Sequence, residues 1–221
     1  MKYIKLFEEF DPYEYMVMSP NKKAQLIIDK IWTSEEQDYD FIKNLIELGA
    51  NLEYFVEATG ETILHVVCEF TQDIKLVEIL LNYGVSPNIE DENGFTPLFS
   101  VANNLNGIDI ATLLLERGAD INNNKNYTGC TPLHMASENA NFPIAETFLF
   151  FGANPNATDK EDNTPLHYVL ERESEEVAEL LLEYGADPTF KNVDGISPLD
   201  LAQSQDSKSI INLFKNHSNM K

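Results

Sequence analysis

Three of the four histidines occupy one recurring position. His65, His134 and His167 each stand three residues after a threonine. An imidazole can ligate zinc or act as a general base, but zinc ligands must converge on one point. Residues that recur at one position of a repeat form a line instead. We therefore interpret these histidines as structural groups that bond the backbone of the adjacent loop.

The other candidate chemistry is weaker. Cys68 and Cys130 lack the C-x-x-C spacing of a zinc or redox site, so we expect both to be reduced and packed, as in a cytosolic protein. Residues 159–163 are similar to the start of a calcium loop, but Thr164 and Leu170 stand where glycine and glutamate are needed. Without a nucleophile or phosphate-binding motif, we expect no enzymatic activity, no cofactor and no metal.

The charge of the chain favours some partners over others. Of the 221 residues, 15 are Lys or Arg and 37 are Asp or Glu, which gives a formal net charge of -22. Such a field repels nucleic-acid phosphates and anionic membranes, so we expect neither as a partner. A protein with a basic surface fits better. The alternative is that the acidity only keeps the chain soluble.

A four-residue motif recurs along the chain at intervals of 34, 35, 33 and 33 residues. It reads T-I-L-H, T-P-L-F, T-P-L-H, T-P-L-H and S-P-L-D, beginning at Thr62, Thr96, Thr131, Thr164 and Ser197. A second marker runs in phase, at Gly49, Gly84, Gly118, Gly152 and Gly185. Two motifs with one period predict a stack of similar units.

Each unit is predicted to contain two helices. The Thr or Ser can cap a short first helix with Pro just inside it. Apolar residues then recur at helical spacing, as at Leu76, Ile79 and Leu80, and the glycine provides a stop with positive φ. Turn residues such as those at 91–94 and 192–195 indicate a loop between units.

These motifs resemble the ankyrin repeat, over roughly residues 36–216. The resemblance implies an all-α repeat solenoid, in which helix-turn-helix units with β-turn fingers bury a continuous core between neighbours. We divide the chain into an N-terminal amphipathic segment (1–18), a degenerate capping repeat (19–57), four repeats (58–90, 91–125, 126–158, 159–191), a C-terminal capping repeat (192–216) and a tail (217–221).

The ends depart from the repeat. We expect helices from Ser19 to about Trp32 and from Asp40 to Leu48 in the N-terminal cap. Tyr3, Phe7 and Phe10 predict a short helix that folds onto this cap or docks on another protein. The opening residues also resemble short leaders of bacteriophage proteins, which points to a bacterial or host-cell cytosol.

The resemblance implies that a partner binds in the concave groove, on the finger tips and the ends of the first helices. The candidate residues on the fingers are Glu61, Glu92, Asn93, Phe95, Tyr127, Thr128, Lys160, Glu161 and Asn163. Those late in the first helices are Glu69, Phe70, Asn103, Asn104, Glu138, Asn139, Glu171 and Arg172.

Among these residues, aromatic anchors with an acidic rim suit a Lys- or Arg-bearing protein surface. The alternative is that Phe95 and Tyr127 pack on the next finger and bind nothing. The leading hypothesis is a monomeric, non-enzymatic scaffold or inhibitor. An acidic decoy that blocks a nucleic-acid-binding or host-defence protein is the second, and an enzyme is the least favoured.

Overall fold

The computed structural model describes residues 12–33, 38–56 and 59–219. Within these ranges the regular structure is helical, and the β contact is an isolated bridge between Phe55 and Thr62. The predicted helix at Tyr3–Phe10 lies outside the described residues, which begin with the short helix α1 (Pro12–Val17). No helix in the described ranges is long and apolar enough to cross a membrane.

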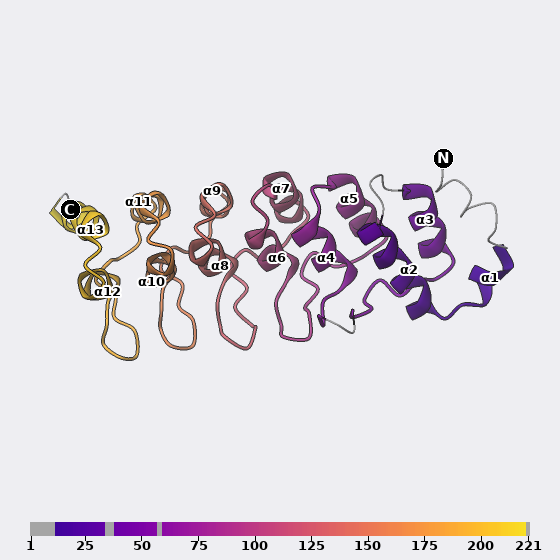
Figure 1. Cartoon of the computed structure of the whole chain (residues 1–221), viewed down its shortest axis with the longest axis horizontal. Coiled ribbons are helices and arrows are strands. Elements are labelled where there is room, and N and C mark those ends of the chain that lie inside the picture. The colour runs from indigo at the N-terminus through magenta and orange to yellow at the C-terminus, as the bar shows by residue number, and fades with distance from the viewer. Residues whose placement is uncertain (1–11, 34–37, 57–58, 220–221) are drawn as a thin grey trace.

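The helices form two rows, with loops extending from one side of the stack (Figure 1). The inner row, nearest the loops, comprises α2 (Pro20–Thr33), α4 (Ile63–Phe70), α6 (Pro97–Asn103), α8 (Pro132–Glu138), α10 (Pro165–Tyr168) with the 3-10 helix η2 (Val169–Glu171), and α12 (Pro198–Ser204). The outer row comprises α3 (Tyr39–Glu47), α5 (Ile74–Asn82), α7 (Ile108–Glu116), α9 (Phe142–Phe150), α11 (Glu175–Glu183) and α13 (Lys208–Asn219). The predicted all-α repeat solenoid is confirmed.

The repeated motifs form the predicted helix boundaries. Thr62, Thr96, Thr131, Thr164 and Ser197 are the N-caps of the inner helices. The outer helices end before glycines in the left-handed region, for example Gly84 at φ 92° and Gly152 at φ 93°. An L side chain at these positions would be strained, which explains why the second marker is always glycine.

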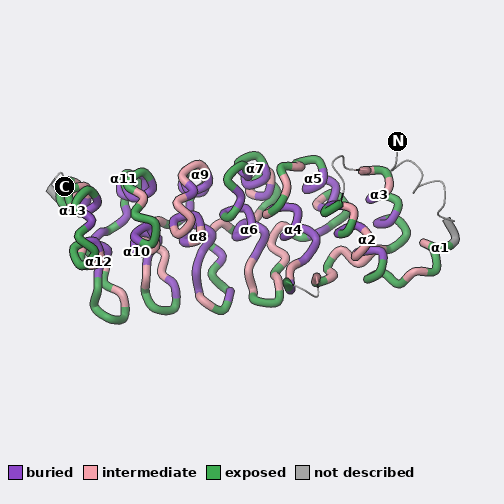
Figure 2. The backbone as a smooth tube through the Cα atoms, viewed as in Figure 1, coloured by how far each residue is buried: buried purple, intermediate pink, exposed green. Residues whose placement is uncertain are grey.

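The core runs without interruption along the stack. Leu64, Leu98, Leu133 and Leu166 of the inner helices are fully buried, and all four belong to one apolar cluster. The buried residues follow the facing sides of both rows (Figure 2). Each unit therefore hides its apolar face only against its neighbours, as the repeat pattern predicts.

Backbone hydrogen bonds join successive loops into a row of fingers. The amide of Glu92 donates to the carbonyl of Gly60 at 3.1 Å, and that of Lys160 donates to Thr128 at 3.0 Å. Tyr127 and Val193 make the same contact with the preceding finger. These bonds hold the finger tips side by side, so residues from different repeats share one surface.

The two end units close the stack in different ways. The first pair, α2 and α3, has the predicted helices without the T-P-L-H start. The last helix, α13, runs to Asn219 and so continues past residue 216, where we placed the end of the repeats. The first helix of the preceding unit is also irregular, because α10 ends at Tyr168 and continues as η2.

Candidate protein-binding surface

The recurring histidines hold each unit to the next. Nδ1 of His134 accepts hydrogen bonds from the Thr131 amide at 3.0 Å and the Thr131 hydroxyl at 2.8 Å. Its Nε2 lies 3.0 Å from the carbonyl oxygen of Asn163 in the next loop. His65 reaches Phe95 and His167 reaches Ile196 in the same way. The predicted bond from imidazole to the adjacent loop is confirmed.

These contacts fix the protonation state of the ring. A backbone amide donates to Nδ1, so Nδ1 carries no proton and Nε2–H donates to the carbonyl. Burial lowers the pKa of His134 to about 4, although the carbonyl of Asn163 acts in the opposite direction. The imidazole is therefore neutral at pH 7, with both nitrogens engaged in structural bonds, and is not a free base.

The recurring histidines form a ladder of hydrogen bonds along the stack. The repeat that has Phe99 in place of histidine shows which bonds are lost without the imidazole. The hydroxyl of Thr96 is buried there without a hydrogen-bond partner. The carbonyl of Cys130, which a histidine at 99 would reach by analogy, accepts instead from the side chain of Asn126 at 2.7 Å. The repeat keeps its geometry because another side chain satisfies the loop carbonyl.

The segment that is similar to a calcium loop is a turn with an internal network. One carboxylate oxygen of Asp159 accepts from the amides of Glu161 and Asn163, both at 2.8 Å. The other accepts from the hydroxyl of Tyr168 at 2.8 Å. Tyr168 also lies 3.1 Å from the sulfur of Cys130. Burial acts to raise the pKa of Asp159, but these hydrogen bonds outweigh it and lower the pKa.

Both cysteines are free and buried, as predicted. Burial raises the pKa of the Cys68 and Cys130 thiols, which keeps them protonated and unreactive. Among the described residues, no group of three or more His, Cys, Asp or Glu side chains is arranged to hold a metal ion. The remaining candidate surface is the one formed by the fingers and the ends of the inner helices, which we call the finger surface.

The structure sorts the predicted residues of the finger surface by exposure. The exposed ones are Phe70, Glu92, Asn93, Asn103, Tyr127, Lys160, Glu161, Glu171 and Arg172. The partly exposed ones are Glu61, Glu69, Phe95, Thr128, Glu138, Asn139 and Asn163. One position must be corrected. Asn104 is buried, and its amide nitrogen donates to the carbonyls of Cys68 and Thr71 at 3.0 and 2.8 Å, so it is structural.

An aromatic column leads to the tip of the third finger. The ring centroid of Phe95 lies 5.0 Å from that of buried Phe99 and 5.6 Å from that of Tyr127, both edge to face. Phe95 therefore does pack on the next finger. Tyr127, however, remains 65% exposed, so the column supports its ring without covering it. Rigid support of an exposed aromatic suits an interface anchor.

A second aromatic pair lies at the ends of α2 and α4. The rings of Trp32 and Phe70 are 4.8 Å apart between centroids, and the residues are 54% and 53% exposed. Sequence reasoning found Phe70 but missed Trp32, because the first unit lacks the motif that numbers the other repeats. Both residues of this pair are more than half exposed, whereas in the first group only Tyr127 is.

Polar side chains continue from this pair across three repeats. The carboxyl groups of Glu61 and Glu69 interact electrostatically, and the side chain of Asn103 also acts on Glu69. Asn139 of the next repeat donates to Asn103 at 2.7 Å. Burial and the negative charge of Glu61 raise the pKa of Glu69 to about 7. This group of polar side chains thus contains a carboxyl group, that of Glu69, which is only partly ionised at neutral pH.

Two cations lie toward the C-terminal part of the finger surface. The ammonium group of Lys160 donates to the carbonyl of Tyr127 at 2.7 Å and so spans two fingers. Arg172 is exposed at the end of η2, between Glu171 and Glu173. One repeat earlier, Asn139 corresponds to Arg172 and Glu138 corresponds to Glu171. Acidic groups therefore prevail on the inner helices, and one of the two cations also serves to hold the fingers together.

This arrangement is a helical-repeat stack that presents an extended surface. Comparison with known proteins gives the family: the model described as ankyrin repeats in three copies matches residues 31–125 and 133–221. A model for many copies matches residues 105–149. The chain belongs to the ankyrin repeat family, whose members generally mediate protein–protein interaction.

Its relatives come from varied organisms. The chain is 33% identical to an ankyrin repeat protein of Rickettsia felis over 123 residues, which is 55% of this chain and 40% of the relative. It is 28% identical to human ankyrin repeat and SOCS box protein 6 over 145 residues, 65% of this chain and 34% of the relative. A zebrafish neurogenic locus notch homolog protein 1 is 32% identical over 126 residues, 57% of this chain and 5% of the relative. The chain thus spans less than half the length of each.

Proposed function

We propose that the chain is a non-catalytic scaffold or inhibitor whose finger surface binds a partner protein with a basic surface. The observation that carries this proposal is the exposed pair of Trp32 and Phe70 on the same surface as the acidic side chains of Glu61 and Glu69. Folding does not require two large rings to stay more than half exposed. Exposed aromatics that other side chains hold in place are instead typical of binding hot spots.

The charge of the surface supports a cationic partner. The net charge of the chain is -22, with Glu61 on a finger and Glu69, Glu138 and Glu171 at the ends of the inner helices. A guanidinium or ammonium group beside Glu61 and Glu69 would remove the repulsion between the two carboxylates. Arginine can also stack on the rings of Trp32 and Phe70, which makes it the best-suited side chain.

The two buried free thiols are consistent with a reducing compartment. We propose a cytosolic location, bacterial or in a host cell, because Cys68 and Cys130 are buried, free and protonated. We also propose that the chain acts as a monomer, since strong like charge opposes self-association through this surface.

The experiment that tests the proposal is capture from the source cell followed by quantitative mass spectrometry. Tagged wild type is compared with Trp32→Ala/Phe70→Ala and with a control, Leu48→Ala/Tyr83→Ala, which removes two exposed large side chains at the ends of the outer helices α3 and α5. We expect a protein retained by the wild type and by the control but lost with the aromatic variant. Equal recovery with all three chains would contradict the proposal.

A decoy function is the second candidate, supported by the same net charge. The dependence of partner affinity on salt concentration distinguishes the two functions. An acidic decoy of a nucleic-acid-binding surface depends on many screened charges, so its affinity should fall steeply between low and high ionic strength. A complex anchored by Trp32 and Phe70 should retain most of its affinity, because apolar burial is not screened.

A further inference from the structure

A groove of about 400 Å³ lies between the outer helices α9 and α11, in the row opposite the fingers (Figure 1). It is lined by Phe142, Glu146, Glu176, Glu179, Leu180 and Glu183. Leu180 is buried and Phe142 is partly buried, whereas the four glutamates are exposed. The groove therefore has an apolar floor and an acidic rim.

Helical spacing explains how these residues meet. Phe142, Glu146 and Phe150 recur every four residues and so lie on one stripe of α9. Glu176, Glu179, Leu180 and Glu183 recur at i, i+3, i+4 and i+7 on α11. Phe150, which extends the α9 stripe at its C-terminal end, is 76% exposed.

No cation is among the described residues that line this groove. Among the described residues, the ion pairs are Arg117 with Glu78 and Lys208 with Asp206. None of the four groove glutamates takes part in one. Nor do these glutamates converge on a point, since no described cluster of such groups is suited to a metal ion. A ligand that fits must carry its cation on an extended, partly apolar surface.

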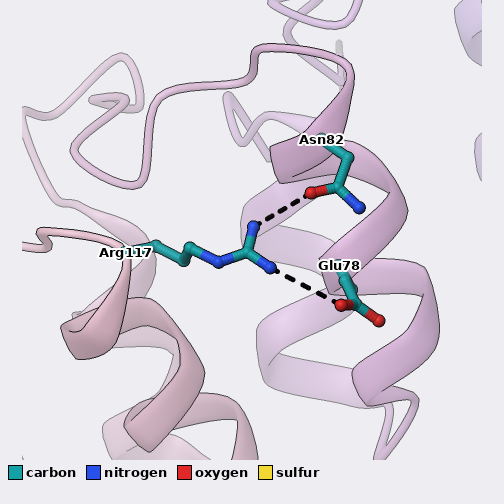
Figure 3. A network of polar contacts seen from close by, with 3 residues as sticks. All are labelled: Glu78, Asn82 and Arg117. Atoms are coloured by element: carbon teal, nitrogen blue, oxygen red, sulfur yellow. Dashed lines mark hydrogen bonds and ion pairs between the residues drawn. The ribbon is translucent and has the colours of Figure 1, made fainter.

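An equivalent site elsewhere in the same molecule shows what such a groove accepts. Arg117, which follows α7, extends across to α5 of the preceding repeat (Figure 3). Its guanidinium lies 3.5 Å from a carboxylate oxygen of Glu78 and donates to the side-chain oxygen of Asn82 at 3.1 Å. A guanidinium therefore bridges this outer-helix pair through side chains on its solvent-facing edge.

Alignment of the repeats on their glycines shows which residues of α9 and α11 correspond to Glu78 and Arg117. Glu78, six residues before Gly84, corresponds to Glu146 before Gly152. Arg117, directly before Gly118, corresponds to Tyr184 before Gly185. The carboxylate is thus kept while the cation is lost, and Tyr184 is 43% exposed.

The partner of the bridging residue has also changed. At α3 and α5, Tyr83 donates its hydroxyl to Glu47 at 2.8 Å, so a tyrosine can bridge when it meets an acceptor. The residue of α9 that corresponds to Glu47 is Phe150, whose ring offers no comparable oxygen acceptor. Neither Arg117 nor the Tyr83 contact therefore has a counterpart between α9 and α11.

We propose that the groove between α9 and α11 is a second docking surface, which binds an arginine-bearing amphipathic helix of a partner protein. The guanidinium takes the place that Arg117 takes at Glu78, between Glu146 and the glutamates of α11. Apolar residues one turn away on the same helix cover Phe142, Leu180 and Phe150. Arginine fits better than lysine because its planar group bonds carboxylates in pairs and stacks on phenyl rings.

A helix is the form of ligand that suits the groove. Its two walls are stripes on neighbouring helices, and the ridge of a third helix packs between such stripes. The proposal does not rest on the finger surface, because all of the lining residues belong to the outer helices. Either surface can be tested, and can fail, without the other.

The probe is a short helix-forming peptide that carries two arginines and one leucine on one face, titrated into the full chain and followed by amide NMR shifts. We expect saturable shifts confined to α9 and α11. Glu146→Gln/Glu179→Gln/Glu183→Gln should weaken binding by about tenfold or more, since each exposed charge contact contributes modestly. A peptide with glutamine in place of arginine should give no saturable shifts.

A control separates the groove from general attraction to an acidic protein. Glu53→Gln/Asp109→Asn/Glu116→Gln makes the same change in net charge at exposed positions outside the groove. We expect this variant to bind the peptide within about twofold of the wild type, because long-range effects are screened. Equal weakening by both triple variants would overturn the proposal.

Tyr184→Arg tests the analogy with Arg117 directly. The new guanidinium should lie beside Glu146, as Arg117 does beside Glu78, and should occupy the groove from within. We expect peptide binding to fall by about tenfold or more, with unchanged folding by circular dichroism. Unaltered peptide affinity, or shifts spread evenly over the acidic surface of the wild type, would overturn the proposal.

Discussion

The indole ring of Trp32 lies 4.8 Å from the ring of Phe70 between centroids, and each residue remains more than half exposed. The two rings come from α2 and α4, so the pair exists only when the first two units are stacked. Trp32 is the one tryptophan of the chain. Its fluorescence therefore reports on the finger surface and on no other site.

Partner binding should change this fluorescence. In the free protein we expect solvent-exposed emission that iodide quenches readily. A bound partner removes water from the ring, so the emission should shift to shorter wavelength and the quenching constant should fall by about half or more. Titration of an isolated partner measures both. A complex that forms while Trp32 stays fully quenchable would place the interface elsewhere.

Two neighbouring asparagines should show opposite behaviour. Asn104→Ala leaves the carbonyls of Cys68 and Thr71 without a donor, so it should lower the free energy of unfolding by about 1–3 kcal/mol. Asn103 is exposed, and Asn103→Ala should cost about 0.5 kcal/mol or less but weaken partner binding. Urea denaturation of both variants checks the stabilities. Equal costs would contradict the assignment of Asn104 to the core.

The carboxyl pair should make stability depend on pH. The pKa of Glu69 is raised from 4.5 to about 7, so the folded state holds this proton more tightly than the unfolded state. The stabilising contribution is complete below pH 4.5 and is lost as pH rises through 7. Glu69→Gln should therefore stabilise the protein relative to wild type at pH 8, with the difference vanishing below pH 4.5.

A second substitution, Glu61→Gln, tests the cause of the raised pKa of Glu69. It keeps a polar group beside Glu69 but removes the negative charge, which should lower the pKa of Glu69 toward its ordinary value. Carboxyl carbon shifts in an NMR titration measure this pKa. An unchanged value would show that burial alone sets it.

The histidine ladder should matter for stability and not for chemistry. His134→Ala removes bonds to Thr131 and Asn163 and leaves the buried amide of Thr131 without an acceptor, so we expect a loss of about 2–4 kcal/mol. His217→Ala is the matched control, because the ring nitrogen Nε2 of His217 has no hydrogen-bond partner in the structure; it should cost about 0.5 kcal/mol or less. Similar losses in thermal or urea unfolding would contradict the role of the ladder.

The pH dependence of the ladder has the opposite sign to that of Glu69. Burial lowers the pKa of His134 from 6.5 to about 4, so the unfolded chain takes up a proton that the folded chain refuses. The stability that His134 contributes is present above pH 6.5 and is lost progressively as pH falls to 4. His134→Ala should flatten this part of the stability curve.

Much of the fold could be predicted because the repeat marks its own boundaries. A Thr or Ser caps the inner helices from α4 to α12, with Pro at the first helical position in four of the five, and a glycine with positive φ follows the outer helices from α3 to α11. The histidine contacts follow from the same period. The sequence could not place Trp32 on the finger surface. Its unit lacks the T-P-L-H motif, so Trp32 could not be aligned with positions of the other repeats.

Asn104 shows why the finer details of the surface could not be predicted. Its counterparts Phe70, Asn139 and Arg172 remain at least partly exposed. The helices α6 and α8 end at corresponding residues, but Asn104 after α6 adopts an extended conformation with ψ 108°, whereas Asn139 after α8 stays helical with ψ -1°. The side chain of Asn104 therefore turns inward to the loop carbonyls. The conformation of the residue after a helix depends on packing between units, which no local pattern reveals.

The central claim is that the exposed rings of the finger surface anchor a partner protein. The most direct measurement is calorimetric titration of the captured partner with wild type, Trp32→Ala/Phe70→Ala and Leu48→Ala/Tyr83→Ala. Two buried aromatic anchors at about 2 kcal/mol or more each predict at least a hundredfold loss with the first variant. The control should bind as the wild type does. Unchanged affinity of a correctly folded Trp32→Ala/Phe70→Ala chain would contradict the account.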